Sequence, residues 1–346
     1  MKSLLIASAG AGFLAAWIPA AGASAASFRS IAADPASGSI QLEAEGAPGN
    51  IAVLEFSSDL ASWIPIHAST NAAWSFVEDG IDPRTDQRFY RIAIHEPLVL
   101  TPAPQWKNRI RLLDDAFWDH TNIWTTPNPL SDLERINWVK FTVFRSDPTQ
   151  VIFQNTREHP LHYAFATTLL DPFLGIGPAV YDAATLHASR QVAVIGSLLF
   201  DPDTLEYGFE FAGEDPYPRE MIRFLAEVVD AAIEKPAGAR RFYMPTFTQT
   251  EAARADAAWF AARGLPLGTV QQWLEGENIY SHGWGIGRLR WLAGAEIEGA
   301  FRDGRLKHDD ILLTDQVPAE LPVLAGIVCL SPSTPNSHAA ILARSY

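Results

Sequence analysis

The chain has 346 residues, which predicts two or three domains at about 150 residues per domain. Hydrophobic residues make up 48% and charged residues 19%, so the sequence can form hydrophobic cores and does not resemble a disordered protein. The net charge is -14, from 26 Lys and Arg against 40 Asp and Glu, so nucleic acid is not an expected partner. The single cysteine, Cys329, excludes a disulfide scaffold and a cysteine-rich zinc module.

Residues 1–25 have the pattern of a secretory signal peptide. Lys2 supplies a positive charge, residues 4–22 form an apolar stretch that Pro19 interrupts, and Ala23-Ser24-Ala25 provides small residues for cleavage. We expect cleavage after about Ala25 and export to the periplasm or the extracellular space. The alternative is an uncleaved membrane anchor, for which the interrupted stretch is barely long enough. We therefore expect no stable membrane insertion after cleavage.

Residues 27–97 are predicted to form a small β-sandwich, because short alternating runs are separated by turn residues. The predicted strands are residues 39–43, 51–56, 63–66, 74–77 and 88–92. The stretches LEFSSDLASW (54–63) and RFYRI (88–92) resemble an accessory β-sandwich module of exported bacterial proteins, which has no chemistry of its own. Trp63 and Trp74 could stack on sugar rings, but we favour core or interface positions for both.

A linker is predicted at residues 98–106, where Pro102 and Pro104 interrupt the chain. Residues 107–275 then mix strand and helix patterns and are predicted to form an α+β domain of unknown role. Its predicted strands are residues 151–154, 191–195 and 207–211, and its predicted helices are residues 218–233 and 251–263, the second opened by a capping box at residues 248–251. His159 and His162 are spaced for a helical metal site, but Pro160 between them argues against it, so no metal ligand is predicted.

Residues 280–346 contain the segment that carries the chemistry. Strands are predicted at residues 288–292 and 311–314, and a buried strand at residues 326–330. Gly283, Gly285 and Gly287 precede a strand, whereas a dinucleotide fingerprint requires a helix after its glycines. After the buried strand, a polar loop leads into an Ala- and Leu-rich helix that begins near His338, with Asn336 or Ser337 as its cap.

That position suits a phosphoryl acceptor. A neutral imidazole is nucleophilic near pH 7 and can carry a phosphoryl group on nitrogen. The backbone N–H groups at the start of a helix, including that of Ala339, would bind the phosphate oxygens without a metal. We therefore predict His338 as the catalytic residue, with Asn336, Ser337 and Ala339 supporting the phosphate loop.

The same residues resemble a known family. DDILLTDQVP (309–318), AGIVCLSPS (325–333) and SHAAILAR (337–344) are similar to the swivelling phosphohistidine domain of phosphoenolpyruvate-utilising enzymes, such as pyruvate phosphate dikinase, phosphoenolpyruvate synthase and glucan water dikinase. The resemblance implies a β/β/α domain in which His338 is phosphorylated. It also implies ATP and Mg in the full-length protein, with none of these cofactors held by this chain itself.

The sequence departs from the family in its loop and in its extent. Ser333, Thr334 and Asn336 stand where the family often has two glycines and a threonine. Neither a nucleotide-binding domain nor a pyruvate-binding barrel is recognisable, and the predicted swivelling domain is incomplete at Tyr346. We expect the chain to be the front part of a longer protein and to be inactive by itself.

Two functions are consistent with these patterns. The first is a dikinase-type phosphotransferase, in which His338 carries phosphate from ATP or phosphoenolpyruvate to pyruvate, a glucan or another small molecule. The alternative is a non-catalytic exported binding or adhesion protein. The signal peptide, the β-module and the 11 tryptophans favour this alternative. The specific SHAAILAR pattern favours the phosphotransferase.

Overall fold

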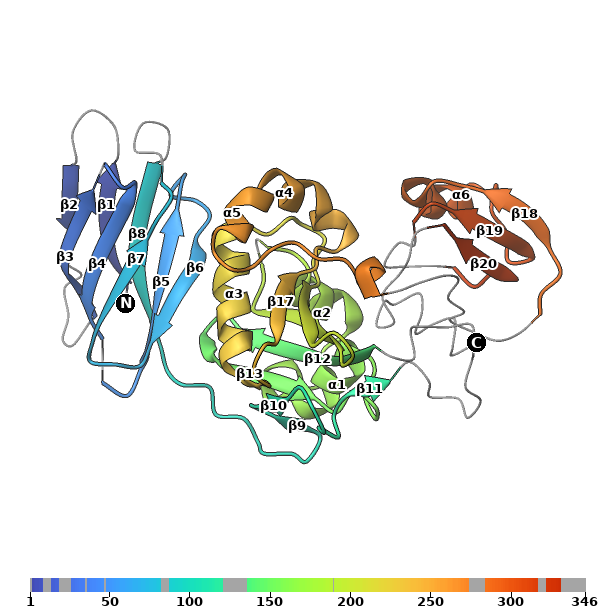
Figure 1. Ribbon diagram of the computed structural model, residues 1–346, viewed down its shortest axis with the longest axis horizontal. Helices are drawn as coiled ribbons and strands as arrows, with labels where there is room; N and C mark the ends of the chain where they lie inside the picture. The colour runs from blue at the N-terminus through green and yellow to red at the C-terminus, as the bar shows by residue number, and fades with distance from the viewer. Residues whose placement is uncertain are drawn as a thin grey trace.

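The computed structural model describes residues 2–8, 14–18, 26–34, 36–46, 48–81, 87–120, 136–188, 190–273, 284–316 and 322–330. These residues form a mixed α+β protein with several separate sheets, as the sequence predicts at that level. Figure 1 shows the N-terminal strands, a central group of strands and helices, and a C-terminal group along the long axis of the molecule.

The described N-terminal strands form two antiparallel sheets. One sheet has the order β3 (Ser27–Asp34), β4 (Ser39–Glu45), β7 (Ala73–Glu78). The other has the order β2 (Leu14–Ile18), β1 (Lys2–Ser8), β8 (Gln87–His95), β5 (Ile51–Ser57), β6 (Ile64–Ser69). Leu42 from the first sheet and Leu54 and Tyr90 from the second belong to one buried cluster, so the sheets share a core. The predicted strands within residues 39–92 are confirmed as β4 to β8, whereas β3 was not predicted.

β1 and β2 lie in the segment that the sequence predicts to be a signal peptide. β1 pairs antiparallel with β8, and β2 pairs antiparallel with β1. Strand pairing in the full chain does not test cleavage, so export stays a prediction.

The two tryptophans considered for sugar stacking are covered by other side chains. Trp74 is buried and its ring lies 5.2 Å from that of His67. Trp63 is half-buried, with the guanidinium of Arg91 over its ring at 4.1 Å. Both therefore contribute to packing in this structure.

The predicted linker is fixed to the central group. The backbone N–H of Leu98 donates to Asp147 at 3.0 Å, and the Gln150 amide donates to the Leu98 carbonyl at 3.1 Å. Leu100 is buried in a core cluster of the central group. The segment therefore packs against that group rather than running free between domains.

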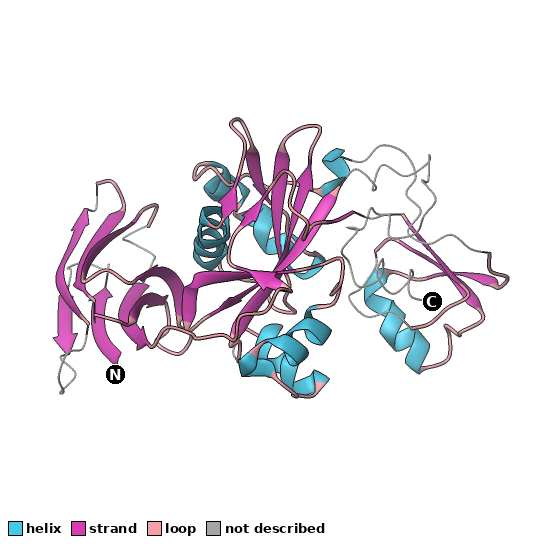
Figure 2. Cartoon of the chain, turned by 90° about the horizontal axis from the view of Figure 1, so that it is seen from below, coloured by secondary structure: helices cyan, strands magenta, loops and turns pink. Residues whose placement is uncertain are grey.

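The central sheet holds the middle of the chain together. Its order is β17 (Arg240–Tyr243), β15 (Glu206–Phe211), β14 (Ala193–Asp201), β12 (Asn137–Phe144), β13 (Asp147–Gln154), β9 (Trp106–Lys107), and β11 (Asp119–His120) also pairs with β12. The strands predicted at residues 151–154 and 207–211 are confirmed, and the one predicted at residues 191–195 begins at Ala193. Figure 2 shows helices on both sides of this sheet.

One face of the central sheet packs against α3 (Arg219–Ala231), and we call it the α3 face. Its core includes Phe141, Leu198 and Phe209 from the sheet and Leu225 from the helix. Pro218 directly precedes α3, in agreement with the predicted start. The predicted end at Ile233 is wrong, because Ile233 opens the short strand β16 (Ile233–Glu234), which pairs in parallel with β10 (Ile110–Arg111).

The opposite face packs against α1 (His162–Leu169), and we call it the α1 face. η2 (Asp171–Phe173), α2 (Pro178–Thr185) and η4 (Val270–Trp273) also lie on this side. Its apolar side chains form separate clusters, one with Phe144, Ile195 and Phe165, the other with Trp138 and Leu199.

The helix predicted at residues 251–263 is broken. The structure has η3 (Phe247–Gln249), α4 (Thr250–Ala255) and α5 (Ala257–Ala261) there, with the break at Asp256. The predicted capping box is wrong because the Thr248 hydroxyl donates instead to the Gly213 carbonyl at 2.8 Å. Asp256 accepts a hydrogen bond from Arg219 at 2.9 Å, which ties the break to α3.

The C-terminal group is a parallel sheet with a helix on one face. β18 (Arg288–Trp291), β19 (Asp310–Thr314) and β20 (Gly326–Cys329) pair in that order, so the three predicted strands are confirmed. η5 (Gly294–Glu296) and α6 (Ile297–Arg302) connect β18 to β19, and α6 was not predicted. α6 packs against the buried Leu312 of β19.

The prediction that β20 is buried is wrong. Ile327 and Val328 are exposed, and Leu330 after the strand is exposed as well. β20 lies at the edge of the described sheet, whereas α6 covers Leu312 at its centre. The side chains of a strand alternate, so the face opposite α6 carries Leu289, Trp291, Ile311, Leu313 and Val328. We call this surface the open face.

Candidate functional site

The predicted phosphoryl acceptor and the residues predicted to support its loop lie outside the described residues. Asn336, Ser337, His338 and Ala339 follow β20 in the sequence, and the description ends at Leu330. The structure therefore describes the sheet that leads to the predicted site.

The strands of this sheet all end at the same edge. β18, β19 and β20 are parallel, so residues 292, 315 and 330 follow their carboxyl ends side by side. Ligand sites in parallel sheets with helical crossovers commonly lie outside the carboxyl ends of the strands. The predicted histidine loop leaves from this edge.

Polar groups join the three strands at that edge. The Asp315 carboxylate accepts a hydrogen bond from the backbone N–H of Gly294 at 2.9 Å, which fixes the start of η5 beside the end of β19. The Thr314 hydroxyl, fully buried, donates to the Gln316 carbonyl at 2.8 Å. The Leu330 N–H donates to the Thr314 carbonyl at 2.8 Å. Neither Asp315 nor Gly294 was predicted as part of a site, although an aspartate directly after a strand is a usable signal.

An ion pair between partly exposed Arg290 and buried Asp310 lies at the opposite end of β19. The Asp310 side chain is buried, and its carboxylate lies 3.4 Å from Nε of Arg290 on β18. The same carboxylate accepts the Lys307 N–H at 2.9 Å. The contact with Arg290 joins β19 to β18, and the contact with Lys307 fixes the turn before β19.

The histidines of the central group have structural contacts. The ring of His159 lies 5.8 Å from that of Phe165, and Nε2 of His162 lies 3.1 Å from the Gly196 carbonyl oxygen. His187 lies 3.5 Å from the carboxylate of Glu214 at the surface. In the part of the chain that the structure describes, no group of three or more His, Cys, Asp or Glu side chains is placed to hold a metal ion.

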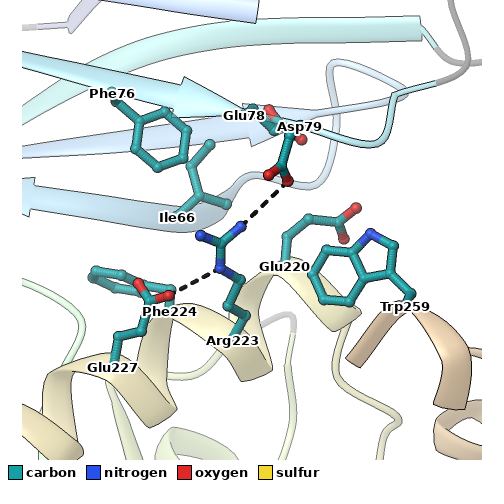
Figure 3. A pocket seen from close by; sticks show the side chains of 9 residues that line it. All are labelled: Ile66, Phe76, Glu78, Asp79, Glu220, Arg223, Phe224, Glu227 and Trp259. Atoms are coloured by element: carbon teal, nitrogen blue, oxygen red, sulfur yellow. Dashed lines mark hydrogen bonds and ion pairs between the residues drawn. The ribbon is translucent and has the colours of Figure 1, made fainter. Parts of the chain in front are cut away.

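A pocket lies where the N-terminal sheets meet α3 (Figure 3). Its empty volume is about 330 Å³, including space open to solvent. It is lined by Ile66, Phe76, Glu78, Asp79, Glu220, Arg223, Phe224, Glu227 and Trp259. Figure 3 shows Arg223 between Asp79 of the N-terminal sheets and Glu227 of α3.

The charges around this pocket are paired across the boundary between the N-terminal and central groups. Arg88 contacts Glu220 at 3.1 Å and Glu78 at 3.5 Å, and Arg263 contacts Asp79 at 2.7 Å. Burial opposes the charged form of Arg88, but Glu78 and Glu220 outweigh that effect and raise its pKa. The pocket is therefore part of the contact between the N-terminal sheets and α3, which we call the seam. Its carboxylates form ion pairs with arginines.

Gly80 allows the closest approach in this seam. Its φ is +72°, and a Cβ there would lie 2.4 Å from the Arg263 guanidinium. The seam thus depends on backbone geometry as well as on charge.

None of the described helices is long and apolar enough to cross a membrane. In comparisons of the chain with protein-family models, with curated proteins and with solved structures, nothing matches.

Proposed function

We propose that the C-terminal part of the chain is a phosphoryl carrier of the dikinase type, with His338 as the acceptor. The observation that carries the proposal is the SHAAILAR sequence, whose His338 lies nine residues after the end of a strand of a parallel sheet. Residues 280–346 would then belong to a swivelling β/β/α domain, residues 27–97 to an accessory β-sandwich and residues 107–275 to an α+β domain of unknown role.

The proposed chemistry is a double displacement. A ring nitrogen of His338 attacks the phosphorus of the donor, an N–P bond forms, and the P–O bond to the nucleotide or to enolpyruvate breaks. The acceptor oxygen then attacks the same phosphorus, and the imidazole leaves with its electron pair. Parallel strand ends and the contact between Asp315 and Gly294 support this proposal, because they give the loop a fixed point of departure.

The test is phosphorylation of this histidine. The chain would be incubated in an extract of the cells that produce it, with ATP labelled in the β or γ phosphate or with labelled phosphoenolpyruvate. We expect label that is stable in alkali and lost in acid, as for an N–P bond, and no label in His338→Ala. Exposed His308, whose Nδ1 contacts the Val323 carbonyl at 2.7 Å, provides the control, and His308→Ala should keep the label.

Two results would contradict the proposal. One is label that persists in His338→Ala, and the other is label that resists acid. Either would favour the alternative, an exported binding or adhesion protein.

A further inference from the structure

β8, with nine residues, has a partner strand on each side. It pairs antiparallel with β5 on one side and with β1 on the other, over seven residues each. β1 belongs to residues 1–25, which the sequence predicts to be cleaved. Loss of these residues would leave the β1 side of β8 without a partner, and we call that side the β8 edge.

The β8 edge lacks the features that keep a sheet edge from pairing. Protected edges carry a bulge, a proline or an uncompensated charge. Residues 87–95 contain neither proline nor lysine, and their register with β1 and with β5 runs without a shift. The arginines of this strand, Arg88 and Arg91, form ion pairs with glutamates of the protein itself. The β8 edge is therefore regular and suited to pairing.

Two other edges of the N-terminal sheets show what protection looks like. β3 ends one sheet and has a bulge between Phe28 and Ser30, with exposed Arg29 at the bulge. β6 ends the other sheet, contains Pro65 and has a shifted register with β5 beside that proline. The contrast indicates that the β8 edge is kept for a partner strand.

The β8 edge also lies where a partner can reach it. Figure 1 shows β1 and β2 at the side of the N-terminal sheets that faces away from the central group. The buried cluster of these sheets has its described residues between Ala26 and Ile92, so loss of residues 1–25 removes none of them.

We propose that the β8 edge is a strand-docking site, which residues 2–8 fill in the unprocessed chain and β8 of a second copy fills after their removal. β1 shows that the edge accepts an antiparallel strand. Two identical antiparallel strands are related by a two-fold axis, the commonest symmetry of protein dimers. Every processed copy exposes the same edge, so a matching partner is always present at equal concentration.

The sequence of β8 allows this pairing. With the two-fold axis at Ile92, Tyr90 lies opposite Ile94, and Arg91 lies opposite Ala93 of the second copy. No two arginines are then directly opposite. Tyr90 and Ile92, both fully buried in the core of one copy, stay on the core side in the other, because opposite residues share a face.

The oligomeric state of the full chain tests the proposal. Cell-free synthesis would keep residues 1–25 attached, and light scattering after size exclusion would give the mass. We expect the unchanged chain to be monomeric and Leu5→Pro to be dimeric, because proline lacks the backbone N–H and does not fit inside a paired strand. The chain that starts at Ala26 should be dimeric as well. Gly22→Pro, outside β1 and β2, is the matched control and should be monomeric.

A peptide then identifies the β8 edge as the contact. The peptide KSLLIAS, residues 2–8, should convert the Leu5→Pro dimer into monomers with one bound peptide each. The same peptide with Leu5→Pro should bind at least about tenfold more weakly, since it loses backbone hydrogen bonds. Phe89→Lys in the Leu5→Pro chain places an uncompensated charge on β8 and should restore the monomer.

Three results would overturn the proposal. The first is a monomer for both the Leu5→Pro chain and the chain that starts at Ala26. The second is a dimer that the peptide leaves intact, and the third is a dimer that Phe89→Lys does not weaken. None of these measurements involves His338, so they are independent of the phosphorylation test.

Discussion

Arg88→Met should strongly destabilise the seam between the N-terminal sheets and α3. The Arg88 side chain is 8% exposed and contacts Glu78 and Glu220, whose side chains are 7% and 12% exposed. Methionine retains much of the packing over the Phe56 ring, where the guanidinium carbon lies at 4.5 Å. It removes the arginine that contacts Glu78 and leaves Glu220 with Arg219, 3.2 Å away. Removing one partner of a buried ion pair costs about 3–5 kcal/mol.

The loss should be visible in equilibrium unfolding. Urea denaturation followed by tryptophan fluorescence gives the free energy of unfolding by linear extrapolation. At roughly 2–4 °C per kcal/mol for a cooperative unit of 150–250 residues, the thermal midpoint should fall by roughly 6–20 °C. Arg302→Met is the matched control, because the Arg302–Glu298 pair is exposed and surface substitutions usually stay within about 0.5 kcal/mol.

A second substitution tests the cause. If the loss comes from the uncompensated carboxylate, Glu220→Gln in the Arg88→Met background should cost less than it does alone, with a coupling of about 0.5–3 kcal/mol. A loss below about 1 kcal/mol for Arg88→Met, or additive effects of the two substitutions, would refute the buried ion-pair explanation.

Two further predictions concern pH and the C-terminal core. Burial lowers the pKa of His67 below 6.5, although Glu227 opposes this shift. The unfolded chain therefore binds more protons than the folded one, and the free energy of unfolding should fall as pH drops below about 6.5. His67→Phe should flatten this slope between about pH 7.5 and 5.5, and an unchanged slope would contradict the prediction. Leu312→Ala should lower the free energy of unfolding by about 2–5 kcal/mol and speed amide hydrogen exchange in β19 but not in β12. Leu289→Ala on the open face is the control and should change little. Equal effects of the two substitutions would argue against the described core.

Alternation made the N-terminal strands predictable. In β4, Ile40, Leu42 and Ala44 are buried, and the residues between them are exposed. A strand with one face on a core and the other in water has this pattern, so its sequence identifies both the strand and the buried side. β18 was predicted from alternation in its sequence as well.

The central strand β12 was missed because its burial does not alternate. Every residue from Trp138 to Phe144 is buried, and these include Lys140 and Thr142. Polar residues in a sequence normally mark the exposed face of a strand, so buried polar residues such as Lys140 and Thr142 make the burial of β12 unpredictable from its sequence. α6 was missed for a different reason, since it has six residues with Gly299 among them.

The candidate site was predictable as a motif but not as an arrangement. SHAAILAR identifies His338, whereas the contact between Asp315 and Gly294 joins residues 21 positions apart. That contact exists because β18 and β19 lie side by side after a helical crossover. An aspartate after a strand can be noticed in the sequence, but its partner cannot be read from the spacing, because strand order is set by packing of the whole unit.

The open face of the C-terminal sheet gives the protein an internal optical reporter. Trp291 on this face is 54% exposed and Trp284, seven residues before it in the sequence, is 89% exposed, whereas Trp118, Trp138 and Trp273 are buried. A collisional quencher such as acrylamide would therefore reduce the fluorescence of these two exposed indoles before that of the buried ones. Any molecule or polypeptide segment that covers the open face would shield Trp291 and shift its emission to shorter wavelength, so its arrival could be followed in real time without attaching a dye.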